Sequence, residues 1–445
     1  MAYHVLVITH DLIADKMAGP AIRCWELASQ LSTICQVTLT SKLPVSRESS
    51  TFKVLSFERS ASELMAQAAA ADILIVQGWM LHDYPVLTTL GKFLVVDLYD
   101  PFVFESYPYF ESRGRHRDET YRHFVQVMNE QMVQGDFFVC ASERQRDMWL
   151  GRFCTLARLT PELFAADPSM ARLIDLVPFG LPSSEPRSLN PVMREVVPGI
   201  GSDDFILLWG GGIWNWFDPL TVIRAVAELS RERSDIKLFF MGTQHPNPEI
   251  PEMEMTNQAI ALAEELGVLG SSVFFNYGWV SYDDRQAYLA EASAGISAHF
   301  DSLETRFSFR TRVLDYLWAG LPVLTTCGDG MAELVAQNQL GAVIPYQDVP
   351  AWKAAIVALA DDPARVASVR SRVRGVGAQF QWAEVAKPLL AYCAAPYRSP
   401  RAVPGSFASP PKGLLGKSVQ TIRQEGVLPF LSRGARYLSR VLARP

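Results

Sequence analysis

The sequence predicts an α/β protein with two successive doubly wound parallel-sheet domains that face a cleft, and three observations support this. Short, continuous apolar runs alternate with helical patterns, as in strands buried on both faces of a parallel sheet. The alternation pauses at residues 176–186, where Gly and Pro are dense, and then restarts. The 445 residues also suffice for two large domains and an appendage.

In the first half, a helix is expected at residues 21–31, and strands are expected at residues 5–8, 37–40, 72–77, 93–97 and 137–141. In the second half, a helix is expected at residues 219–228, and strands are expected at residues 205–209, 236–241, 273–276, 295–298, 322–326 and 342–344. We assign residues 1–178 to a first Rossmann-like domain. We assign residues 179–395 to a second Rossmann-like domain and 396–445 to a basic tail.

Bulk composition narrows the function classes. Hydrophobic residues make up 49% of the chain, which is enough for two cores and excludes a mainly disordered protein. The net charge of −6 gives no global sign of nucleic-acid binding, because such proteins carry a basic balance. The six cysteines show no C-x-x-C spacing. We therefore expect reduced thiols in a cytoplasmic protein, and neither a disulfide framework nor a zinc site.

The chain also carries no targeting or membrane signal that we recognise. The first expected strand begins without the charged region and the cleavage site of a signal peptide. No uninterrupted apolar run approaches the roughly 20 residues that span a bilayer. We therefore expect no transmembrane helix.

Three glycine turns follow expected strands. Gly19 comes after the first strand, Gly211 and Gly212 follow the first strand of the second domain, and Gly242 follows its second strand. Glycine lets backbone N–H groups approach a phosphate closely, and the next helix N-terminus adds partial positive charge. Many such turns use glycine only for its dihedral angles, so both interpretations stay open. We predict phosphate contacts at Gly19, Gly211 and Gly212.

The segment richest in charged groups is residues 299–322, HFDSLETRFSFRTRVLDYLWAGLP. From Arg312 onward its apolar residues recur on one helical face, and Gly320 ends the helix. Arg310 and Arg312 therefore lie at a helix N-terminus, where cations oppose the helix dipole. A bound pyrophosphate would reverse that penalty by accepting bidentate hydrogen bonds from both guanidinium groups.

The other charged residues of this segment have two interpretations each. Arg306 either joins the phosphate site or forms a structural ion-pair cluster with Glu304 and Asp301. Asp315 lies one helical turn beyond Arg312, and a carboxylate near a phosphate site commonly accepts hydrogen bonds from ribose hydroxyls. Alternatively, Asp315 pairs with Arg312 three residues earlier. These last two interpretations are compatible.

Two histidines follow expected strands. His245 comes just after the second strand of the second domain, and we predict it at the rim of the cleft. His299 ends the strand at 295–298, and we predict that it faces the same cleft as a catalytic candidate. The alternative for each is an ordinary loop-capping residue. Trp214 and Trp279 are predicted to pack, with stacking on a base or a sugar as the alternative.

The order of these motifs resembles glycosyltransferase family 4, which has the GT-B fold. The order comprises a Gly-Pro turn after the first strand, the linker VPFGLP, a glycine turn that opens the second domain, and the run RFSFRTRVLDYLWAGLPV. The runs WGGGIWNWFDP and ETRFSFRTRVLDYLWAGLPV further resemble a bacterial subgroup found in cell-surface polysaccharide pathways. The resemblance covers residues 3–393.

The family pattern has two glutamates eight residues apart, before the run A-x-G-x-P-V. Asp315 stands at the position of the second, which contacts the donor ribose, and Phe307 stands at that of the first, which contacts the sugar. Glu304, three residues before Phe307, is therefore the candidate for the sugar contact. The family's histidine near the fourth strand of the first domain is replaced by Tyr99 and Asp100, which makes Asp100 a catalytic candidate.

The resemblance implies a retaining hexosyltransferase that needs no metal and no cofactor besides a nucleoside-diphosphate sugar. The family's phosphate-binding Arg and Lys are replaced by IWNW at residues 213–216, so the phosphates fall to Arg310 and Arg312. The leaving phosphate takes the acceptor's proton, and catalysis is mostly positioning and electrostatic stabilisation. The implied acceptor is a glycan or a lipid-linked glycan. Rival functions are a sugar-nucleotide epimerase of the same fold and, because of Phe307, a non-catalytic glycosyltransferase-like subunit.

The tail has a charge opposite to that of the rest of the chain. From Pro396 it holds nine cations and one anion, a net charge of +8 that leaves −14 for the other residues. From Leu428 its apolar residues recur in steps of three and four, with arginines on the other face. This pattern is typical of a basic amphipathic helix on an anionic membrane surface. We predict that residues 412–445 bring the protein to the inner face of the membrane. The alternative is a helix docked on the first domain.

Overall fold

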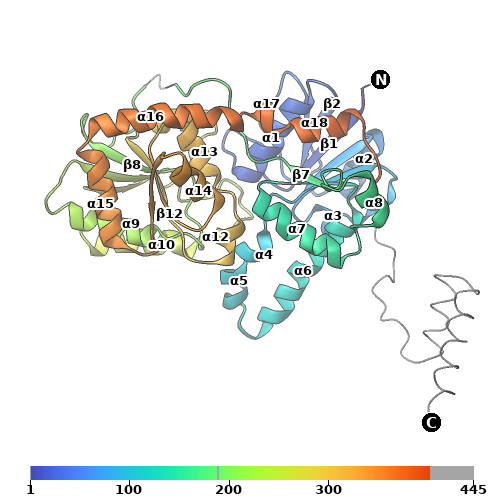
Figure 1. Cartoon of the computed structure of the whole chain (residues 1–445), viewed down its shortest axis with the longest axis horizontal. Coiled ribbons are helices and arrows are strands. Elements are labelled where there is room, and N and C mark those ends of the chain that lie inside the picture. Colours follow the sequence, from blue (N-terminus) through green and yellow to red (C-terminus); the bar gives the residue numbers. More distant parts are fainter. Residues whose placement is uncertain (1, 188–189, 401–445) are drawn as a thin grey trace, which may run out of the picture.

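The structure, a computed structural model, describes residues 2–187 and 190–400, and its ribbon forms two α/β units (Figure 1). The first unit is built on a seven-stranded parallel sheet with the strand order β3-β2-β1-β4-β5-β6-β7. Its strands are β1 (His4–Thr9), β2 (Gln36–Ser41), β3 (Lys53–Ser56), β4 (Ile73–Gln77), β5 (Phe93–Asp97), β6 (Phe137–Cys140) and β7 (Ile174–Leu176).

The second unit has a six-stranded parallel sheet with the order β10-β9-β8-β11-β12-β13. Its strands are β8 (Phe205–Trp209), β9 (Ile236–Phe240), β10 (Val273–Phe275), β11 (Ala294–Ser297), β12 (Val323–Thr326) and β13 (Gly341–Ile344). In both sheets the strand order reverses beside the first strand, between β1 and β4 and between β8 and β11. Ligands of doubly wound sheets bind at such a point, outside the carboxyl ends of the strands.

Alternate side chains of the central strands enter opposite hydrophobic clusters. Val5 and Val7 of β1 belong to one buried cluster, and Leu6 and Ile8 belong to another. Both faces of the sheet are therefore covered, which explains why its strands are continuous apolar runs in the sequence. The predicted architecture of two doubly wound sheets is confirmed.

The helices follow the strands in the order expected of crossover connections. Those of the first half are α1 (Gly19–Leu31), α2 (Ala61–Ala70), α3 (Met80–Asp83), α4 (Phe102–Glu105), α5 (Tyr107–Ser112), α6 (Arg117–Gln134), α7 (Glu143–Thr155) and α8 (Pro161–Ala166). Those of the second half are α9 (Pro219–Leu229), α10 (Glu254–Glu265), α11 (Arg285–Glu291), α12 (Leu303–Phe307), α13 (Thr311–Trp318), α14 (Gly330–Gln337), α15 (Val349–Ala360), α16 (Pro363–Gly377), α17 (Trp382–Val385) and α18 (Lys387–Ala394). Short 3-10 helices are η1 (Pro85–Thr89), η2 (Gly114–His116) and η3 (Ala378–Phe380).

Every strand expected from the sequence is present, and β3 and β7 were not expected. Both strands lie at an edge of the first sheet. β3 alternates between exposed and half-buried residues, and β7 has only three residues. Because an edge strand contacts one neighbour and is partly open to solvent, neither forms the continuous apolar run that marks the central strands.

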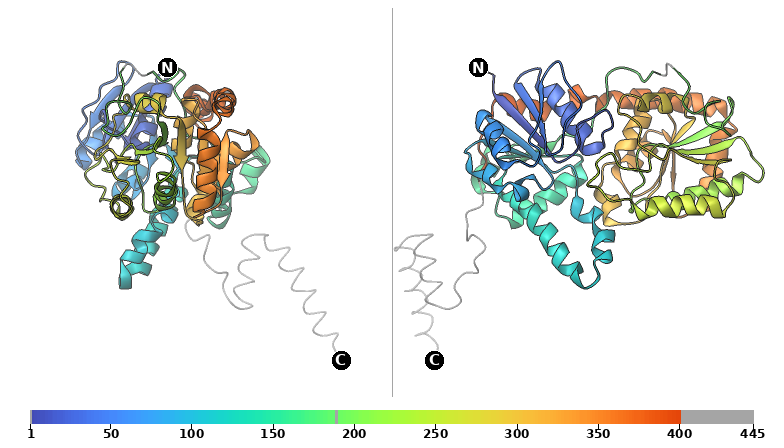
Figure 2. Two further views of the ribbon diagram at one scale, coloured as in Figure 1. Left: turned by 90° about the vertical axis from the view of Figure 1, so that its left-hand side faces the viewer. Right: turned by 180° about the vertical axis from the view of Figure 1, so that it is seen from behind.

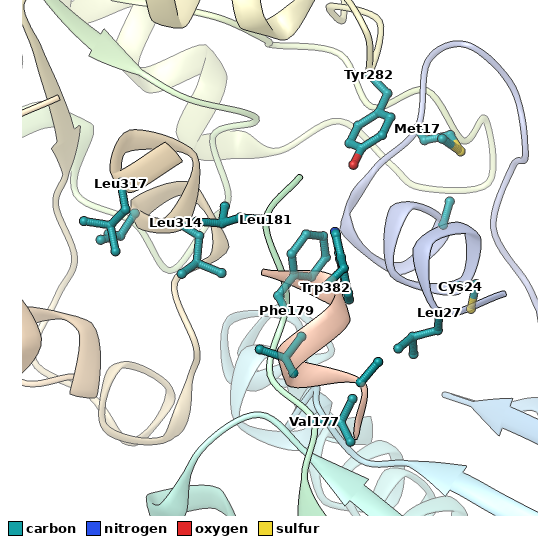
Figure 3. Close-up of a cluster of buried hydrophobic side chains, with 14 of the residues drawn as sticks. Met17, Cys24, Leu27, Val177, Phe179, Leu181, Tyr282, Leu314, Leu317 and Trp382 are labelled. Carbon is teal, nitrogen blue, oxygen red and sulfur yellow. The ribbon is translucent and has the colours of Figure 1, made fainter. Parts of the chain in front are cut away.

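The linker after β7 is held by a segment that returns from the second domain. The Phe179 ring packs 5.0 Å from the Trp382 ring between centroids. Leu181 exchanges backbone hydrogen bonds with Phe380 and Trp382, at 2.7 and 3.0 Å. A Cβ on Gly180 would lie 2.4 Å from the Trp382 ring, so this close approach requires glycine. Figure 3 shows the resulting cluster, which combines side chains of both units.

The last described helices return to the first unit. Helices α17 and α18 pack against α1 (Figure 1). On the same helix, Arg23 is fully buried and donates to Asp97 at 2.5 and 3.0 Å. The Arg23 guanidinium also donates to the carbonyl oxygens of Val177 and Pro178, at 2.7 and 3.1 Å. One buried ion pair therefore ties α1, the end of β5 and the linker together.

A hairpin of α5 and α6 projects away from both sheets (Figures 1 and 2). The rings of Phe110 and Phe124 meet edge to face at 5.0 Å and pack the two helices together. None of the described helices has the length and apolar character needed to cross a membrane. The predicted amphipathic helix at residues 412–445 lies outside the described residues.

Candidate functional site

A cavity of about 830 Å³ lies between the carboxyl ends of the two sheets. Residues that follow β1, β4 and β5 form the wall contributed by the first domain. Residues that follow β8 and β9, together with the start of α13, form the wall contributed by the second domain. The predicted residues that line this cavity are Gly19, Asp100, Gly211, Gly212, His245, Arg310, Arg312 and Asp315.

The predicted glycine turns give the cavity a wall of backbone. Gly211 has φ of +74°, a left-handed conformation that favours glycine. A Cβ on Gly212 would lie 3.0 Å from the Trp279 ring. Gly19 begins α1 on the opposite wall, where a Cβ would meet only the Tyr99 hydroxyl, at 3.8 Å. A ligand can therefore approach the backbone closely at both turns.

Arg312 is a buried cation on the second domain's wall. It lies in the first turn of α13, a turn without an acidic residue, and its side chain is only 8% exposed. The guanidinium carbon lies 4.2 Å from the Phe217 ring and 4.7 Å from the Trp209 ring. Nη2 donates to the Gly212 carbonyl at 2.9 Å, whereas Nη1 has no hydrogen-bond partner among the described residues.

Burial and, to a smaller extent, repulsion by Arg310 lower the pKa of Arg312 to about 10. The guanidinium therefore remains charged at neutral pH. A buried charged donor without a partner is unfavourable by about 1–3 kcal/mol or more. The arrangement is suited to an anion that enters from the cavity.

Arg310, two residues earlier, is already neutralised. Its Nη1 and Nη2 donate to the two carboxylate oxygens of Glu304 at 2.6 and 2.7 Å, and Nη2 also donates to Thr305 at 3.2 Å. Glu304 is 2% exposed and is not among the residues that line the cavity. The expectation that both guanidinium groups are open to phosphate is therefore corrected for Arg310. The ion pair expected of Glu304 exists, but with Arg310 rather than Arg306.

Two further placements differ from the sequence prediction. Arg306 is exposed on α12 and lies outside the residues that line the cavity. His299 is fully buried, and its ring nitrogens lie 3.0 Å from the hydroxyls of Ser297 and Thr326. The Phe217 ring, 5.3 Å away, packs on His299. His299 therefore belongs to the core, and the prediction that it faces the cleft is wrong.

Burial, with the charges of Arg310 and Arg312, holds the pKa of His299 well below its usual value. The ring is therefore neutral at pH 7. Phe307, where the resemblance leads us to expect a sugar-contacting glutamate, stacks on Phe104 at 5.6 Å between ring centroids. Neither His299 nor Phe307 lines the cavity.

Asp315 lines the cavity but pairs with a residue that the sequence did not indicate. Its carboxylate lies 3.4 Å from Nε of Arg285, rather than on Arg312. The Arg285 guanidinium lies over the rings of Tyr282 and Trp318, at 3.8 and 4.8 Å. Burial raises the pKa of Asp315, and Arg285 partly offsets that rise. The pair fixes the orientation of the carboxylate.

His245 lies at the rim of the cavity, as predicted. Its ring centroid is 5.4 Å from that of Trp214 and 5.5 Å from that of Trp279. Nδ1 accepts the backbone N–H of Asn247 at 3.0 Å. Burial lowers the pKa of His245, so the ring is neutral at pH 7. Both tryptophans line the cavity with it and offer aromatic surface to a ligand.

On the first domain's wall, Asp100 lies beside Glu105, which the sequence did not single out. Both residues line the cavity, and each carboxyl group shifts the pKa of the other. Burial raises the pKa of Asp100 to about 6, and it raises that of Glu105 well above the usual value with help from Asp100. Two neighbouring carboxyl groups repel each other when both are charged, which favours a proton on one of them.

The two walls also contact each other directly. Asn247 donates to the Asp11 carboxylate at 2.9 Å, and Trp279 Nε1 donates to the Met17 carbonyl at 3.0 Å. These contacts join the loop after β9 and the loop after β10 to the loop after β1. The cavity is therefore bordered on that side by hydrogen bonds between the domains.

Some wall residues had no signal in the sequence and others had a weak one. Gln77 is the last residue of a correctly predicted strand, and strand ends meet at the cleft, so its position was a usable signal. Glu105 ends the one-turn helix α4, and Arg285 begins α11 without a recognisable motif. Within residues 2–187 and 190–400, no group of three or more His, Cys, Asp or Glu residues could hold a metal ion.

A family model of glycosyl transferases group 1 matches residues 204–362, which contain most of the second domain and its cavity wall. No curated protein matches the chain. The match therefore applies to the half of the molecule that carries Arg312 and Asp315.

Solved structures similar to the whole described chain are glycosyltransferases. WaaG, a glycosyltransferase involved in lipopolysaccharide biosynthesis, is 17% identical with a TM-score of 0.62, and the match covers 88% of this chain and 100% of WaaG. Anabaena HepE, in complex with UDP and glucose, is 13% identical with a TM-score of 0.61 and coverage of 87% and 98%. Sucrose-phosphate synthase from Thermosynechococcus elongatus is 16% identical with a TM-score of 0.58 and coverage of 87% and 97%. The chain has the GT-B fold that was expected.

Proposed function

We propose that this protein is a glycosyltransferase that moves a hexose from a nucleoside-diphosphate sugar to a carbohydrate acceptor, with retention of anomeric configuration. The GT-B fold and the match of residues 204–362 to glycosyl transferases group 1 support the class. In this proposal the donor binds the second domain's wall, and the acceptor binds the first domain's wall.

Arg312 carries the proposal. It is a buried cation whose Nη1 finds no partner within the described chain and whose side chain lines the cavity. The diphosphate of the nucleotide sugar would accept a hydrogen bond from Nη1 and neutralise the charge of the guanidinium group. The first turn of α13 and the backbone at Gly211 and Gly212 would add further donors and a favourable dipole.

Asp315 and the aromatic rim account for the rest of the nucleotide. The Asp315 carboxylate, oriented by Arg285, would accept hydrogen bonds from the ribose hydroxyls. Trp214, Trp279 and His245 form the adjacent aromatic surface, which suits a flat base. Gly19 leaves room for the donor sugar beside the first domain's wall.

The reaction breaks the bond between the anomeric carbon and the phosphate oxygen as the acceptor oxygen bonds to that carbon. The acceptor's hydroxyl proton moves to the departing diphosphate, so no separate base is required. Arg312 stabilises the charge that develops on the diphosphate, which is the role that a metal ion has in other enzymes. Arg310, held by Glu304, fixes the loop that leads into α13. We propose no metal and no cofactor besides the donor.

A thermal-shift screen with UDP, GDP and ADP and their glucose conjugates tests this proposal. A ligand at about 100 times its Kd stabilises the folded state by about 2.7 kcal/mol. We expect the nucleotides of one base to stabilise the wild type and to stabilise Arg312→Met much less. The anomer of the transferred sugar is then read by NMR. Stabilisation by none of these nucleotides contradicts the proposal, and conversion of the donor sugar without an acceptor would indicate an epimerase.

We further propose that the acceptor belongs to a lipid-linked cell-surface polysaccharide at the inner face of the membrane. The charge of the tail supports this setting, because each basic residue near an anionic surface contributes about 1 kcal/mol. A chain that ends at Pro400 is expected to co-sediment less than the full chain with phosphatidylglycerol vesicles. Equal sedimentation of both chains contradicts the membrane role of the tail.

A further inference from the structure

The first domain's wall holds a pair of acids that the donor chemistry does not use. Asp100 follows β5, and the one-turn helix α4 brings Glu105 back beside it. The Oδ1 atom of Asp100 is buried without a hydrogen-bond partner in the part of the chain that the structure describes. Both residues line the cavity. The pair is therefore placed where a ligand can reach it.

The cations around this pair are committed to other carboxylates. Arg23 forms its ion pair with Asp97, and Arg310 forms its ion pair with Glu304. The charged groups that act on the pair are Asp97 of β5, Glu304 of α12, and Arg310 at the start of α13. Because each of these charges is already paired, none of them offsets the burial and the mutual repulsion of two carboxylates, so a second negative charge on the pair is unfavourable. One proton shared between Asp100 and Glu105 removes that repulsion.

Gln77 supplies an independent sign that a ligand binds here. It is 7% exposed, lines the same cavity, and lies opposite Asp97 in the register of β4 and β5. Its Nε2 donates to Thr9 at 3.0 Å and to the Pro20 carbonyl at 3.4 Å, which fixes the orientation of the amide. The Oε1 atom then faces no hydrogen-bond donor among residues 2–187 and 190–400.

We propose that Gln77, Asp100 and Glu105 form the subsite for the hydroxyl groups of a carbohydrate acceptor. This inference rests on the proposed function and names the residues that hold its second substrate. Gln77 Oε1 and Asp100 Oδ1 accept hydrogen bonds from hydroxyl groups. The shared proton leaves the pair with a single negative charge.

The chemistry of this wall selects hydroxyl groups over the other polar groups of the substrates. The open atoms of Gln77 and Asp100 are acceptors, so they repel a phosphate, which also presents acceptors. A hydroxyl group donates to an acceptor and also accepts the shared proton, so it satisfies both members of the pair. The nucleotide therefore binds at the opposite wall, on Arg312, and the sugar to be extended binds at this one.

Infrared spectroscopy of the full chain tests the shared proton. At pH 7 the wild type is expected to show the C=O stretch of a protonated carboxyl group that is missing in Glu105→Gln. Glu111→Gln is the matched control, because Glu111 lies on α5 with a side chain that is 70% exposed. We expect its spectrum to keep the band. Identical intensity of the band in all three proteins overturns the shared proton.

Saturation-transfer NMR tests the ligand, with the methyl glycosides of glucose, galactose, mannose and N-acetylglucosamine in the presence of UDP. At least one glycoside is expected to give a signal with the wild type and with Glu111→Gln. That signal should fall at least threefold in Gln77→Leu and Glu105→Ala, whose thermal shift with UDP stays unchanged and shows that they are folded. An undiminished signal in both variants, or no signal with the wild type, overturns the subsite.

The same samples separate this inference from the proposed function. Loss of the glycoside signal together with a normal UDP shift supports the subsite. A wild type that binds UDP but no glycoside counts against the subsite alone. A wild type that binds a glycoside but is not stabilised by UDP, GDP or ADP counts against the proposed donor and leaves the sugar-binding wall in place.

Discussion

On the second domain's side of the cavity, Arg312 Nη1 is a buried donor with no partner in the described chain. On the first domain's side, Gln77 Oε1 and Asp100 Oδ1 are buried acceptors in the same condition. The two walls come from the same kind of parallel sheet, in each case from the carboxyl ends of its strands. They differ in the groups that the loops after those strands present to the cavity.

This difference shows how a symmetrical architecture can sort two substrates. A diphosphate presents acceptors and negative charge, and it is attracted to the wall with the open donor. A sugar presents hydroxyl groups, and it is accommodated by the wall with open acceptors. The sheets place both walls at a common cleft, and in our proposal the loops determine which substrate each wall binds.

Arg310→Ala is expected to give the largest change in stability, because Arg310 is the ion-pair partner of a buried carboxylate. The substitution leaves Glu304 buried without its ion-pair partner, which lowers the free energy of unfolding by about 3–5 kcal/mol. Chemical denaturation measures the change. Arg306→Ala, at an exposed position, is the control and should change stability by at most about 0.5 kcal/mol. Equal stability of the two variants contradicts the assignment.

Arg312→Met is expected to act on ligand binding instead. The apoprotein should keep its stability, because the substitution removes a desolvated charge without orphaning an anion. The affinity for UDP should fall by about 1.5–3 kcal/mol, the range for a hydrogen bond to a charged group, or tenfold to a hundredfold. Isothermal titration calorimetry measures the change. An unaltered Kd removes Arg312 from the donor site.

Asp100→Asn tests the first domain's wall through the pH dependence of the free energy of unfolding. Burial raises the pKa of Asp100 to about 6, so the folded state retains a proton that the unfolded chain releases. Wild-type stability therefore falls as the pH rises from about 4 to about 6. Asp100→Asn lacks this loss. Its free energy of unfolding, relative to that of the wild type, should therefore rise by on the order of 1–2 kcal/mol across that interval. Denaturation curves at several pH values measure the gain, and a difference independent of pH contradicts it.

Asp315→Asn has the smallest expected effect. In the proposed donor site it weakens the hydrogen bonds to ribose and the pairing with Arg285, and UDP affinity is expected to fall by about 0.5–1.5 kcal/mol. The more specific result is discrimination between UDP and 2′-deoxy-UDP, which should be clear in the wild type and reduced in the variant. If both proteins discriminate equally, Asp315 does not contact the ribose.

The sequence predicted the central part of the fold well, for a physical reason. Strands covered on both faces, such as β1 and β8, must be continuously apolar, and that property is visible without a structure. The edge strands β3 and β7 are partly exposed, so their composition does not separate them from loops. The hairpin of α5 and α6 depends on aromatic packing between residues with no simple spacing.

The position of the candidate site could be predicted from the sequence, but the pairing of its side chains could be predicted only in part. Arg312 and Asp315 were located correctly because a strand end followed by a helix N-terminus must lie at the cleft. Spacing could not show that Glu304, on the one-turn helix α12, forms an ion pair with Arg310, or that Nη1 of Arg312 has no partner in the described chain. For the same reason it could not show that the Phe217 ring packs on His299 within the core.

The central claim is that the two walls have opposite roles, and binding of inorganic pyrophosphate tests it most directly. This probe has the diphosphate but neither base nor sugar, so it reports on the donor wall alone. Calorimetry should detect binding to the wild type, unchanged binding to Glu105→Gln, and a loss of at least tenfold in Arg312→Met. Equal binding to wild type and Arg312→Met, or a loss of binding in Glu105→Gln, would contradict the assignment of the walls.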